Sequence, residues 1–198
     1  MQLYRKNAGS GSKEELLLKS DKARYPDDWS PDGKTLIFDE YVNRGDGRAL
    51  PMEGERKPYD VISTPFRDMR GRLSPDGKWI VYESDESGSR QVYLQSFPPS
   101  GGKWQVSTGG GSEPQWRKDG RELNYRCGSL IMAVEISTAG IVEISAPRKL
   151  FEFRWSASGS KVNYVPSGDG KRFLVNVYAG DNASTPITVV LNWMAALK

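Results

Sequence analysis

The sequence predicts an all-β fold built from repeated four-stranded units, and three observations support this prediction. A five-residue turn, Ser30-Pro31-Asp32-Gly33-Lys34, returns in identical form at residues 74–78. Apolar and polar residues alternate along the segments that leave each turn, as is typical of strands. No segment shows apolar residues at helical spacing. The repeating element is therefore a hairpin with one strand on each side of the turn.

The turn aspartates set the length of the repeat. The aligned copies are Asp32, Asp76, Asp119 and Asp169, at intervals of 44, 43 and 50 residues. A period in the low forties is that of a four-stranded β-propeller blade. Proline presets φ, aspartate accepts hydrogen bonds from backbone amides, and glycine adopts positive φ. The requirements of a tight turn therefore account for these residue types without any ligand. We expect a structural role for the four aspartates.

Counting from the turns divides the chain into a half blade and about four blades, all in one propeller domain spanning residues 1–198. The half blade is 1–20, and the blades are 21–64, 65–108, 109–154 and 155–198.

Strand patterns support each unit in order. The half blade has strands in 2–6 and 13–20. Blade one has strands from about Tyr25 and at 36–38, 48–52 and 59–62, and blade two has them from about Met69 and at 79–84, 91–97 and 104–107. Blade three has them at 113–117, 122–126, 130–136 and 149–153, and blade four at 162–165, 172–177 and 187–193. The last blade is expected to lack its outermost strand.

Composition narrows the possible chemistry. The 198 residues are 37% hydrophobic, enough for a substantial core, and 28 basic residues interleave with 25 acidic ones for a net charge of +3. We therefore expect no nucleic-acid partner. The chain has no histidine, which excludes Ser-His-Asp and Cys-His nucleophile systems and His-ligated zinc. The single cysteine, Cys127, is expected to be a small core residue.

The N-terminal residues carry no apolar stretch of signal-peptide or membrane-span length. We expect no membrane span and a cytoplasmic location for the chain as expressed, while a longer parent protein would be compatible with the periplasm.

Several stretches resemble a known family. WSPDGK, LSPDGKWIVYESDESG, SEPQWRKDGREL and TPITVVLNWMAALK are similar to repeats of the TolB-like, WD-repeat-like β-propellers. The resemblance is nearest to the propeller that follows the kinase and membrane segments of many soil-bacterial serine/threonine kinases, although this chain has no kinase signature. It implies a propeller of six or so blades that acts in sensing or protein interaction. The chain departs from the family pattern at 48–51 and at Ser167-Gly168.

An unfinished ring leaves strand edges without partners, because propellers protect their edges by closing. Two remedies are open. Residues 14–19 would supply the outer strand of blade four and close a small four-bladed ring. Alternatively, two chains would associate through their open edges or by exchanging terminal strands. We favour self-association and expect a homo-oligomer.

A ligand site is expected where the innermost strands begin, since side chains from different blades converge there on the axis. These candidate residues differ between blades while the turns do not, which fits both a binding site and a solvated channel wall. The candidates are Asp27, Asp28, Arg67, Asp68, Arg70, Arg72, Glu113, Gln115, Asn163 and Tyr164.

The leading hypothesis is a non-enzymatic module that binds a protein or small-molecule ligand, with no cofactor expected. The alternative is a metal-assisted hydrolase of activated esters or phosphotriesters. In that case Asp27, Asp28, Asp68 and Glu113 would hold a divalent cation such as Ca²⁺ or Zn²⁺ that activates water. Most of the six tryptophans are expected to pack in the core rather than stack on sugars, with Trp155 the most exposed.

Overall fold

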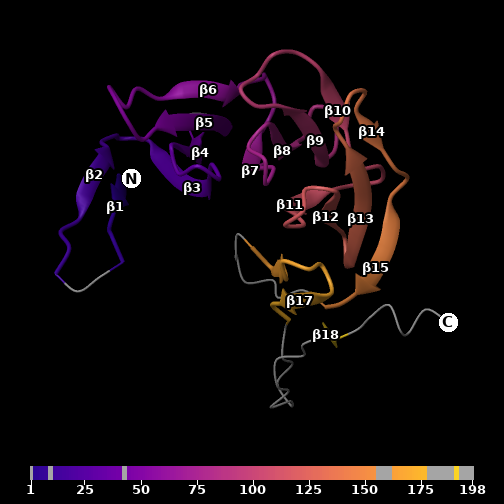
Figure 1. Ribbon diagram of the computed structural model, residues 1–198. Helices are drawn as coiled ribbons and strands as arrows, with labels where there is room; N and C mark the ends of the chain where they lie inside the picture. The colour runs from indigo at the N-terminus through magenta and orange to yellow at the C-terminus, as the bar shows by residue number, and fades with distance from the viewer. Residues whose placement is uncertain (1, 9–10, 42–43, 155–161, 178–189, 192–198) are drawn as a thin grey trace.

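The computed structural model describes residues 2–8, 11–41, 44–154, 162–177 and 190–191, and these form strands and turns. Antiparallel sheets follow one another around an open arc (Figure 1). This arrangement confirms the predicted all-β propeller with about four blades. The described part of the chain contains no helix that could cross a membrane.

Blades one and two are regular four-stranded sheets. Blade one consists of β3 (Ala23–Trp29), β4 (Thr35–Tyr41), β5 (Asp46–Pro51) and β6 (Tyr59–Ile62), paired in that order. Blade two consists of β7 (Met69–Leu73), β8 (Trp79–Ser84), β9 (Gln91–Ser96) and β10 (Lys103–Gln105). The sequence placed a strand in each of these positions.

Blade three carries a strand that the sequence did not predict. β11 (Ser112–Trp116), β12 (Glu122–Cys127), β13 (Leu130–Ser137) and β15 (Arg148–Glu152) form the expected blade. The additional strand, β14 (Glu143–Ile144), pairs with the last residues of β13, beyond the part of β13 that pairs with β15. A short hairpin therefore extends this blade at its outer edge.

Blade four has three strands within the described residues, β16 (Tyr164–Pro166), β17 (Arg172–Val175) and β18 (Val190–Leu191). At the other end of the chain, β1 (Leu3–Arg5) and β2 (Glu15–Leu18) pair with each other as the predicted half blade. In the described residues β2 pairs with β1 and not with β18, so it does not complete blade four. The small closed ring considered from the sequence is not the arrangement seen.

The turn motif behaves as its chemistry predicts. Asp32 accepts hydrogen bonds from the Ser30 hydroxyl at 2.6 Å and from the Lys34 amide at 3.0 Å. The same two bonds recur in the second copy, where Gly77 has a φ of 70°. The aspartate and the glycine thus fix a tight turn between the inner two strands of a blade.

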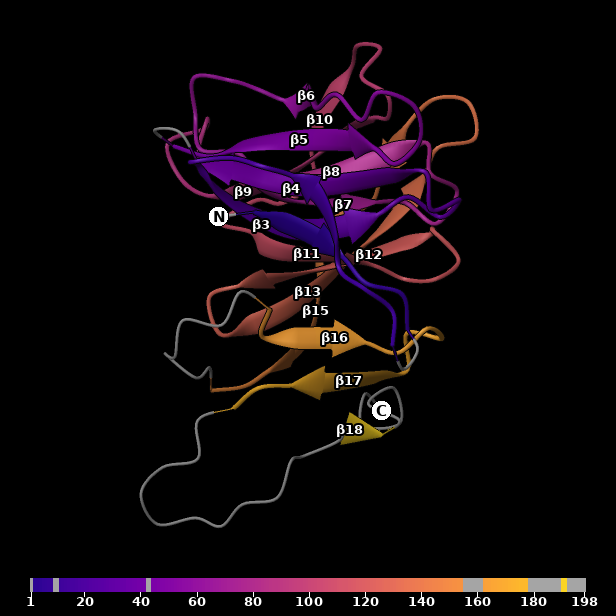
Figure 2. The ribbon, with the colours of Figure 1, turned by 90° about the vertical axis from the view of Figure 1, so that its left-hand side faces the viewer.

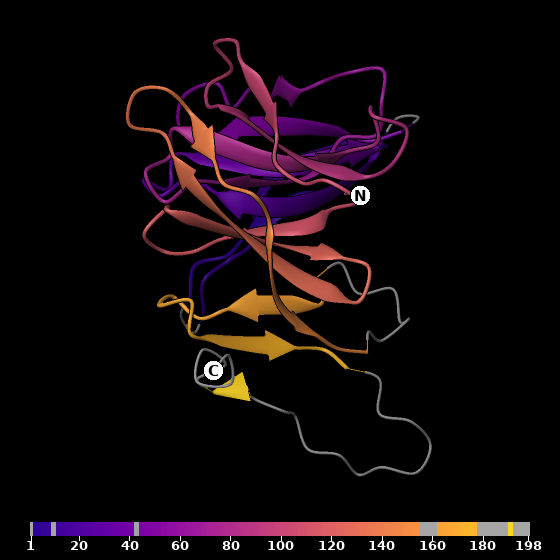
Figure 3. The same ribbon diagram turned by 90° about the vertical axis from the view of Figure 1, so that its right-hand side faces the viewer.

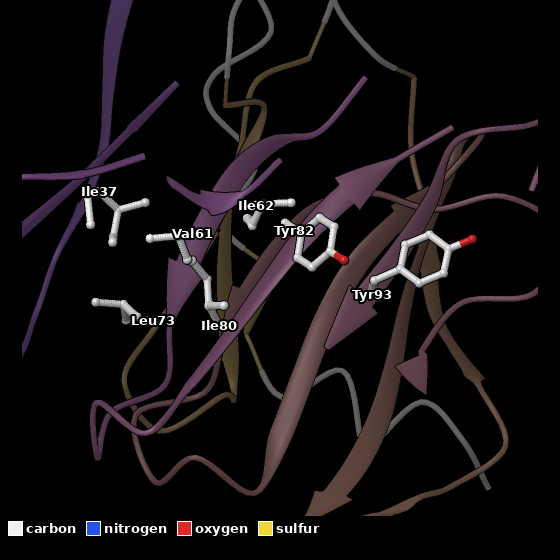
Figure 4. Packing of buried hydrophobic residues seen from close by; sticks show 8 residues of the cluster. Ile37, Val61, Ile62, Leu73, Ile80, Tyr82 and Tyr93 are labelled. Atoms are coloured by element: carbon white, nitrogen blue, oxygen red, sulfur yellow. The ribbon is translucent and has the colours of Figure 1, made fainter. Parts of the chain in front are cut away.

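The core lies between successive blades, and the repeat decides which blade each side chain faces. Residues four and six positions after the turn aspartate pack toward the preceding blade, and the residue five positions after it packs toward the following blade. Ile80 and Tyr82 thus meet Ile37 between blades one and two (Figure 4). The hairpin takes the place of a preceding blade for blade one, where Leu3 and Leu17 pack on Phe38.

The tryptophans and the cysteine pack against the core less completely than expected. Trp29 is 44% exposed at the last position of β3. Trp79 and Trp116, at the ends of β8 and β11, are only partly buried and pack against the core between blades two and three. Trp104 is partly buried on β10. Cys127 is likewise partly exposed at the last position of β12. Trp155, expected to be the most exposed tryptophan, and Trp193 lie outside the described residues.

Candidate functional site

The candidate residues at the start of the inner strands hold neighbouring blades together. The clearest contacts use an acidic side chain on the second strand of one blade. Asp39 on β4 accepts a hydrogen bond from the Arg70 amide at 3.0 Å, and Glu83 on β8 accepts one from the Glu113 amide at 2.6 Å. Both carboxylates are almost fully buried. Each therefore links its blade to the inner strand of the next.

The amides are presented by an unusual backbone conformation. Arg70 and Glu113 have φ values of 58° and 55°, in the left-handed region that side chains other than glycine seldom adopt. Each lies in a break of register, between Met69 and Arg72 in one strand and between Ser112 and Gln115 in the other. A β-bulge of this kind turns a backbone amide out of its own sheet. Here the amide is directed at the preceding blade.

The third interface uses the same amide position with a different acceptor. Asn163 stands six residues before its turn aspartate, as Arg70 and Glu113 do. Its amide donates to Glu113 Oε2 at 2.9 Å, and its side-chain nitrogen donates to Glu113 Oε1 at 2.8 Å. The Tyr164 hydroxyl donates to the Glu113 carbonyl oxygen at 2.8 Å. Glu113 thus serves two interfaces at once.

Arginine side chains balance these buried carboxylates. Arg70 forms an ion pair with Glu83 at 2.8 Å, and Arg126 forms one with Glu113 at 2.9 Å. Burial alone would lower the pKa of Arg70, but the charge and hydrogen bond of Glu83, together with the charges of Glu113 and Asp39, outweigh burial and raise the pKa. Burial also raises the pKa of the Tyr164 hydroxyl, and Glu113 adds to the effect. The result is a charge-balanced network that runs through blades one to four.

A second contact joins the inner strands of blades one and two. Asp28 accepts hydrogen bonds from the Leu73 amide at 2.8 Å and the Trp29 amide at 2.9 Å. Burial raises the pKa of this carboxyl, and the Leu73 hydrogen bond opposes that rise. The Arg72 guanidinium donates to the Asp27 carbonyl oxygen. Both acidic candidates of blade one therefore lie where blade two packs.

The remaining candidates lie apart from this network. Asp68 is fully buried and accepts a hydrogen bond from the Thr64 hydroxyl at 2.6 Å. The Arg67 amide donates to Asp85 Oδ1 at 2.9 Å. Gln115 is half-buried on β11 opposite Asn124. A ligand-binding role for any of these residues stays a prediction.

The proposed metal ligands do not form a cluster. Among the described residues no three cysteine, aspartate or glutamate side chains are grouped so that they could hold a metal ion. Asp28 and Glu113 direct their oxygens at amides and guanidinium groups of the neighbouring strands. This arrangement stabilises blade packing and leaves no shared set of free carboxylate oxygens on these two residues.

Three side chains of this network share one position in the repeat. Asp39, Glu83 and Arg126 each stand seven residues after a turn aspartate. Two of them, Asp39 and Glu83, are acidic. Each accepts a hydrogen bond from the backbone amide that lies six residues before the turn aspartate of the next blade. Blade one has Pro26 at that amide position, which has no N–H to donate.

Apolar pairs remain exposed at both ends of the arc. On the β1–β2 hairpin, Tyr4 and Leu16 are register partners and are 54% and 43% exposed. On blade four, Val165 and Leu174 are register partners and are 49% and 57% exposed. The β16–β17 sheet lies at one end of the stack of blades (Figure 2). The view from the other side shows the same placement (Figure 3).

No protein-family model matches the chain, and no curated protein sequence does. Solved structures do. TolB from Acinetobacter baumannii aligns with a TM-score of 0.66 and 20% identity, over 90% of this chain and 43% of TolB. The chain has the TolB-like β-propeller fold.

Two further structures agree with this TolB-like fold. A putative TolB from Agrobacterium tumefaciens has a TM-score of 0.58 and 16% identity, over 77% of this chain and 61% of that one. The periplasmic gluconolactonase of Pseudomonas aeruginosa has a TM-score of 0.52 and 18% identity, over 88% of this chain and 56% of the gluconolactonase. The TolB-like chain spans less than half the length of A. baumannii TolB. At these identities the likeness concerns the fold alone.

Proposed function

We propose that this chain is a propeller interaction module that associates with a second copy of itself through the two ends of its arc. The observation that carries the proposal is the exposure of Leu174. It occupies the repeat position of Ile37 and Val81, five residues after the turn aspartate. Those two side chains are fully buried at the interfaces with the following blade, whereas Leu174 is 57% exposed.

The opposite end of the chain offers a surface of the same kind. The hairpin packs its inner face, including Leu17, on blade one and leaves Tyr4 and Leu16 outward. Apolar side chains on the flat face of a sheet gain stability when another sheet covers them, at about 25 cal/mol per Å² buried. A joint between the hairpin of one copy and blade four of the next would cover both apolar pairs.

Such a joint is heterologous, and two equivalent joints close a symmetric dimer. Two copies bring together eight blades and two hairpins. That total lies at the upper end of the usual range of about four to eight blades. The proposed assembly is therefore a closed ring of two chains, with each end face buried.

Disulfide trapping tests the joint directly. In a Cys127→Ser background, Leu16→Cys protein is mixed with Leu174→Cys protein and oxidised. We expect a disulfide-linked dimer that contains one chain of each kind. The matched control mixes Leu174→Cys with Ser87→Cys, an exposed position in a turn of blade two. Equal cross-linking in the two mixtures would refute the joint.

The hydrolase alternative gains no support from the described side chains. Its proposed ligands Asp28 and Glu113 are engaged with the neighbouring blade, and Asp68 is bound to Thr64. The interaction module is therefore the function that we carry forward.

A further inference from the structure

A groove lies between blades two and three at the turn end of their inner strands. One wall is formed by Ser74, Asp76 and Trp79, and the second by Trp116 and the turn around Asp119. The third wall is the β13–β14 hairpin, through residues 135–139 and 143–145. The groove has a volume of about 890 Å³. This is within the range of about 300 to 1,000 Å³ typical of ligand pockets.

Two tryptophans from successive blades line this groove. Trp79 packs edge-to-face on Trp104 with ring centroids 5.7 Å apart. Trp116 donates a hydrogen bond from Nε1 to the Arg72 carbonyl oxygen at 3.2 Å. These contacts hold both indoles in place while each stays only partly buried. A fixed, partly exposed indole attracts cations and apolar groups without first having to be ordered.

The charges in the groove are predominantly negative. Four acidic residues line it, Asp76, Asp119, Glu135 and Glu143, against two basic ones, Arg117 and Arg121. Arg117 binds Asp119 through two hydrogen bonds of 2.9 and 2.8 Å and also lies 3.3 Å from Glu122. Its charge is thus already balanced.

The carboxylates of the hairpin wall are available to a ligand. Glu135 and Glu143 are exposed, and in the described ranges neither forms an ion pair, although the Glu135 charge contributes to the raised pKa of Arg117. Glu143 pairs in register with Ser137, two residues from Glu135, so the two acidic residues occupy neighbouring strands of one wall. They favour a cationic occupant over an anionic one.

The hairpin wall also offers a strand edge. β14 pairs with β13, and the described residues place no strand on its other side. An extended segment can therefore add to this edge through backbone hydrogen bonds. Ile141, at the tip of the same hairpin, is 85% exposed. An apolar residue of the segment would have a partner there.

We propose that this groove binds an extended peptide segment that carries lysine or arginine next to apolar residues. The basic side chains meet the indoles of Trp79 and Trp116 and the carboxylates of Glu135 and Glu143. The backbone of the segment runs along β14. This site is separate from the end faces and does not depend on self-association.

Calorimetric titration with two blocked peptides tests the proposal. The probes are Ac-KLRVKL-amide and its acidic counterpart Ac-ELEVEL-amide. We expect the basic peptide to bind and the acidic one not to bind, with an affinity that falls as salt is raised. Failure of the basic peptide to bind at millimolar concentration would overturn the proposal. Equal binding of both peptides would overturn it as well.

Substitutions of groove residues test whether the peptide binds in the groove. The double variant Glu135→Gln/Glu143→Gln is expected to weaken the basic peptide about fivefold, which corresponds to two exposed ion pairs. Arg121→Ala is expected to strengthen it, because a like charge is removed. The matched control, Glu14→Gln/Glu53→Gln, removes two exposed carboxylates remote from the groove. A control that weakens binding as much as the groove variant would show non-specific attraction and refute the site.

A neutral oligosaccharide, maltoheptaose, is titrated in parallel because tryptophan-lined grooves also bind sugars. If maltoheptaose binds and the basic peptide does not, the groove is a saccharide site and the peptide proposal fails. If the peptide binds and its affinity responds to the three groove substitutions with the expected signs, the proposal holds.

Discussion

The Glu83 carboxylate accepts a hydrogen bond from the backbone amide of Glu113 at 2.6 Å and joins blade two to blade three. The same carboxylate pairs with the Arg70 guanidinium, whose own backbone amide binds Asp39 of blade one. Glu83 thus joins blade two to blade three, and its ion-pair partner Arg70 joins blade two to blade one. Removing Glu83 leaves the buried Glu113 amide without its acceptor and takes the nearest negative charge from the partly buried Arg70, which is costly in a low-dielectric interior.

Glu83→Ala is expected to lower the free energy of unfolding by about 3 to 5 kcal/mol, the usual cost of breaking a buried ion pair from one side. Glu83→Gln keeps an oxygen that can accept the Glu113 amide and should cost less. Urea unfolding followed by tryptophan fluorescence measures both changes. Glu14→Ala, on an exposed side chain, is the control, and similar losses for Glu83→Ala and Glu14→Ala would contradict the role given to Glu83.

The Glu40 carboxyl should make the stability of the protein depend on pH. Burial alone would raise the pKa of this carboxyl, but hydrogen bonds from Arg48 and Arg24 outweigh burial, and the pKa is lowered from its ordinary value of 4.5. Its contribution to stability is therefore present above pH 4.5 and is lost as the pH falls through the lower folded-state pKa.

Glu40→Gln should accordingly destabilise the protein by about 3 kcal/mol at pH 7. The difference from the wild type should shrink at pH values below 4.5. Unfolding curves at a series of pH values measure the difference. A difference that stays constant down to pH 3 would contradict the assignment.

Gly77 tests the turn. Its φ of 70° lies in the left-handed region, and a Cβ there would meet only Pro31, at 3.4 Å from Cδ and 3.8 Å from Cγ. Gly77→Val should cost about 1 to 3 kcal/mol through backbone strain. Gly77→Asn should cost less, because asparagine adopts positive φ more readily. An unchanged melting temperature for Gly77→Val would refute the turn argument.

Chelation tests the hydrolase alternative. We expect treatment with EDTA to leave the melting temperature unchanged and the protein to show no metal-dependent hydrolysis of chromogenic esters or phosphotriesters. Activity that is abolished by EDTA and restored by Ca²⁺ or Zn²⁺ would revive the axial-carboxylate hypothesis. Asp68→Asn would then show whether that buried carboxylate takes part.

Much of the fold could be predicted from the sequence because the turn motif is local. Proline, aspartate and glycine act within five residues, so Ser30–Lys34 and its copies locate every inner hairpin. The short β14 was missed because two residues, Glu143 and Ile144, are too few to show alternation.

The candidate site was less predictable because it depends on contacts between blades. The sequence placed Asp28, Glu113 and Asn163 near the axis, and the structure brings Glu113 and Asn163 together. It could not show that their oxygens and amides would bind each other, since that depends on bulges which turn Arg70 and Glu113 to positive φ. The groove was missed because the tryptophans were expected in the core.

Light scattering of the wild-type protein at micromolar concentration measures self-association without any substitution or label. We expect the wild-type protein to have a mass of twice 22.1 kDa and the Leu174→Glu variant a mass of 22.1 kDa. Ile141→Glu, which changes an exposed side chain away from both end faces, should keep the dimer. A wild-type protein that shows only the 22.1 kDa species would contradict the account.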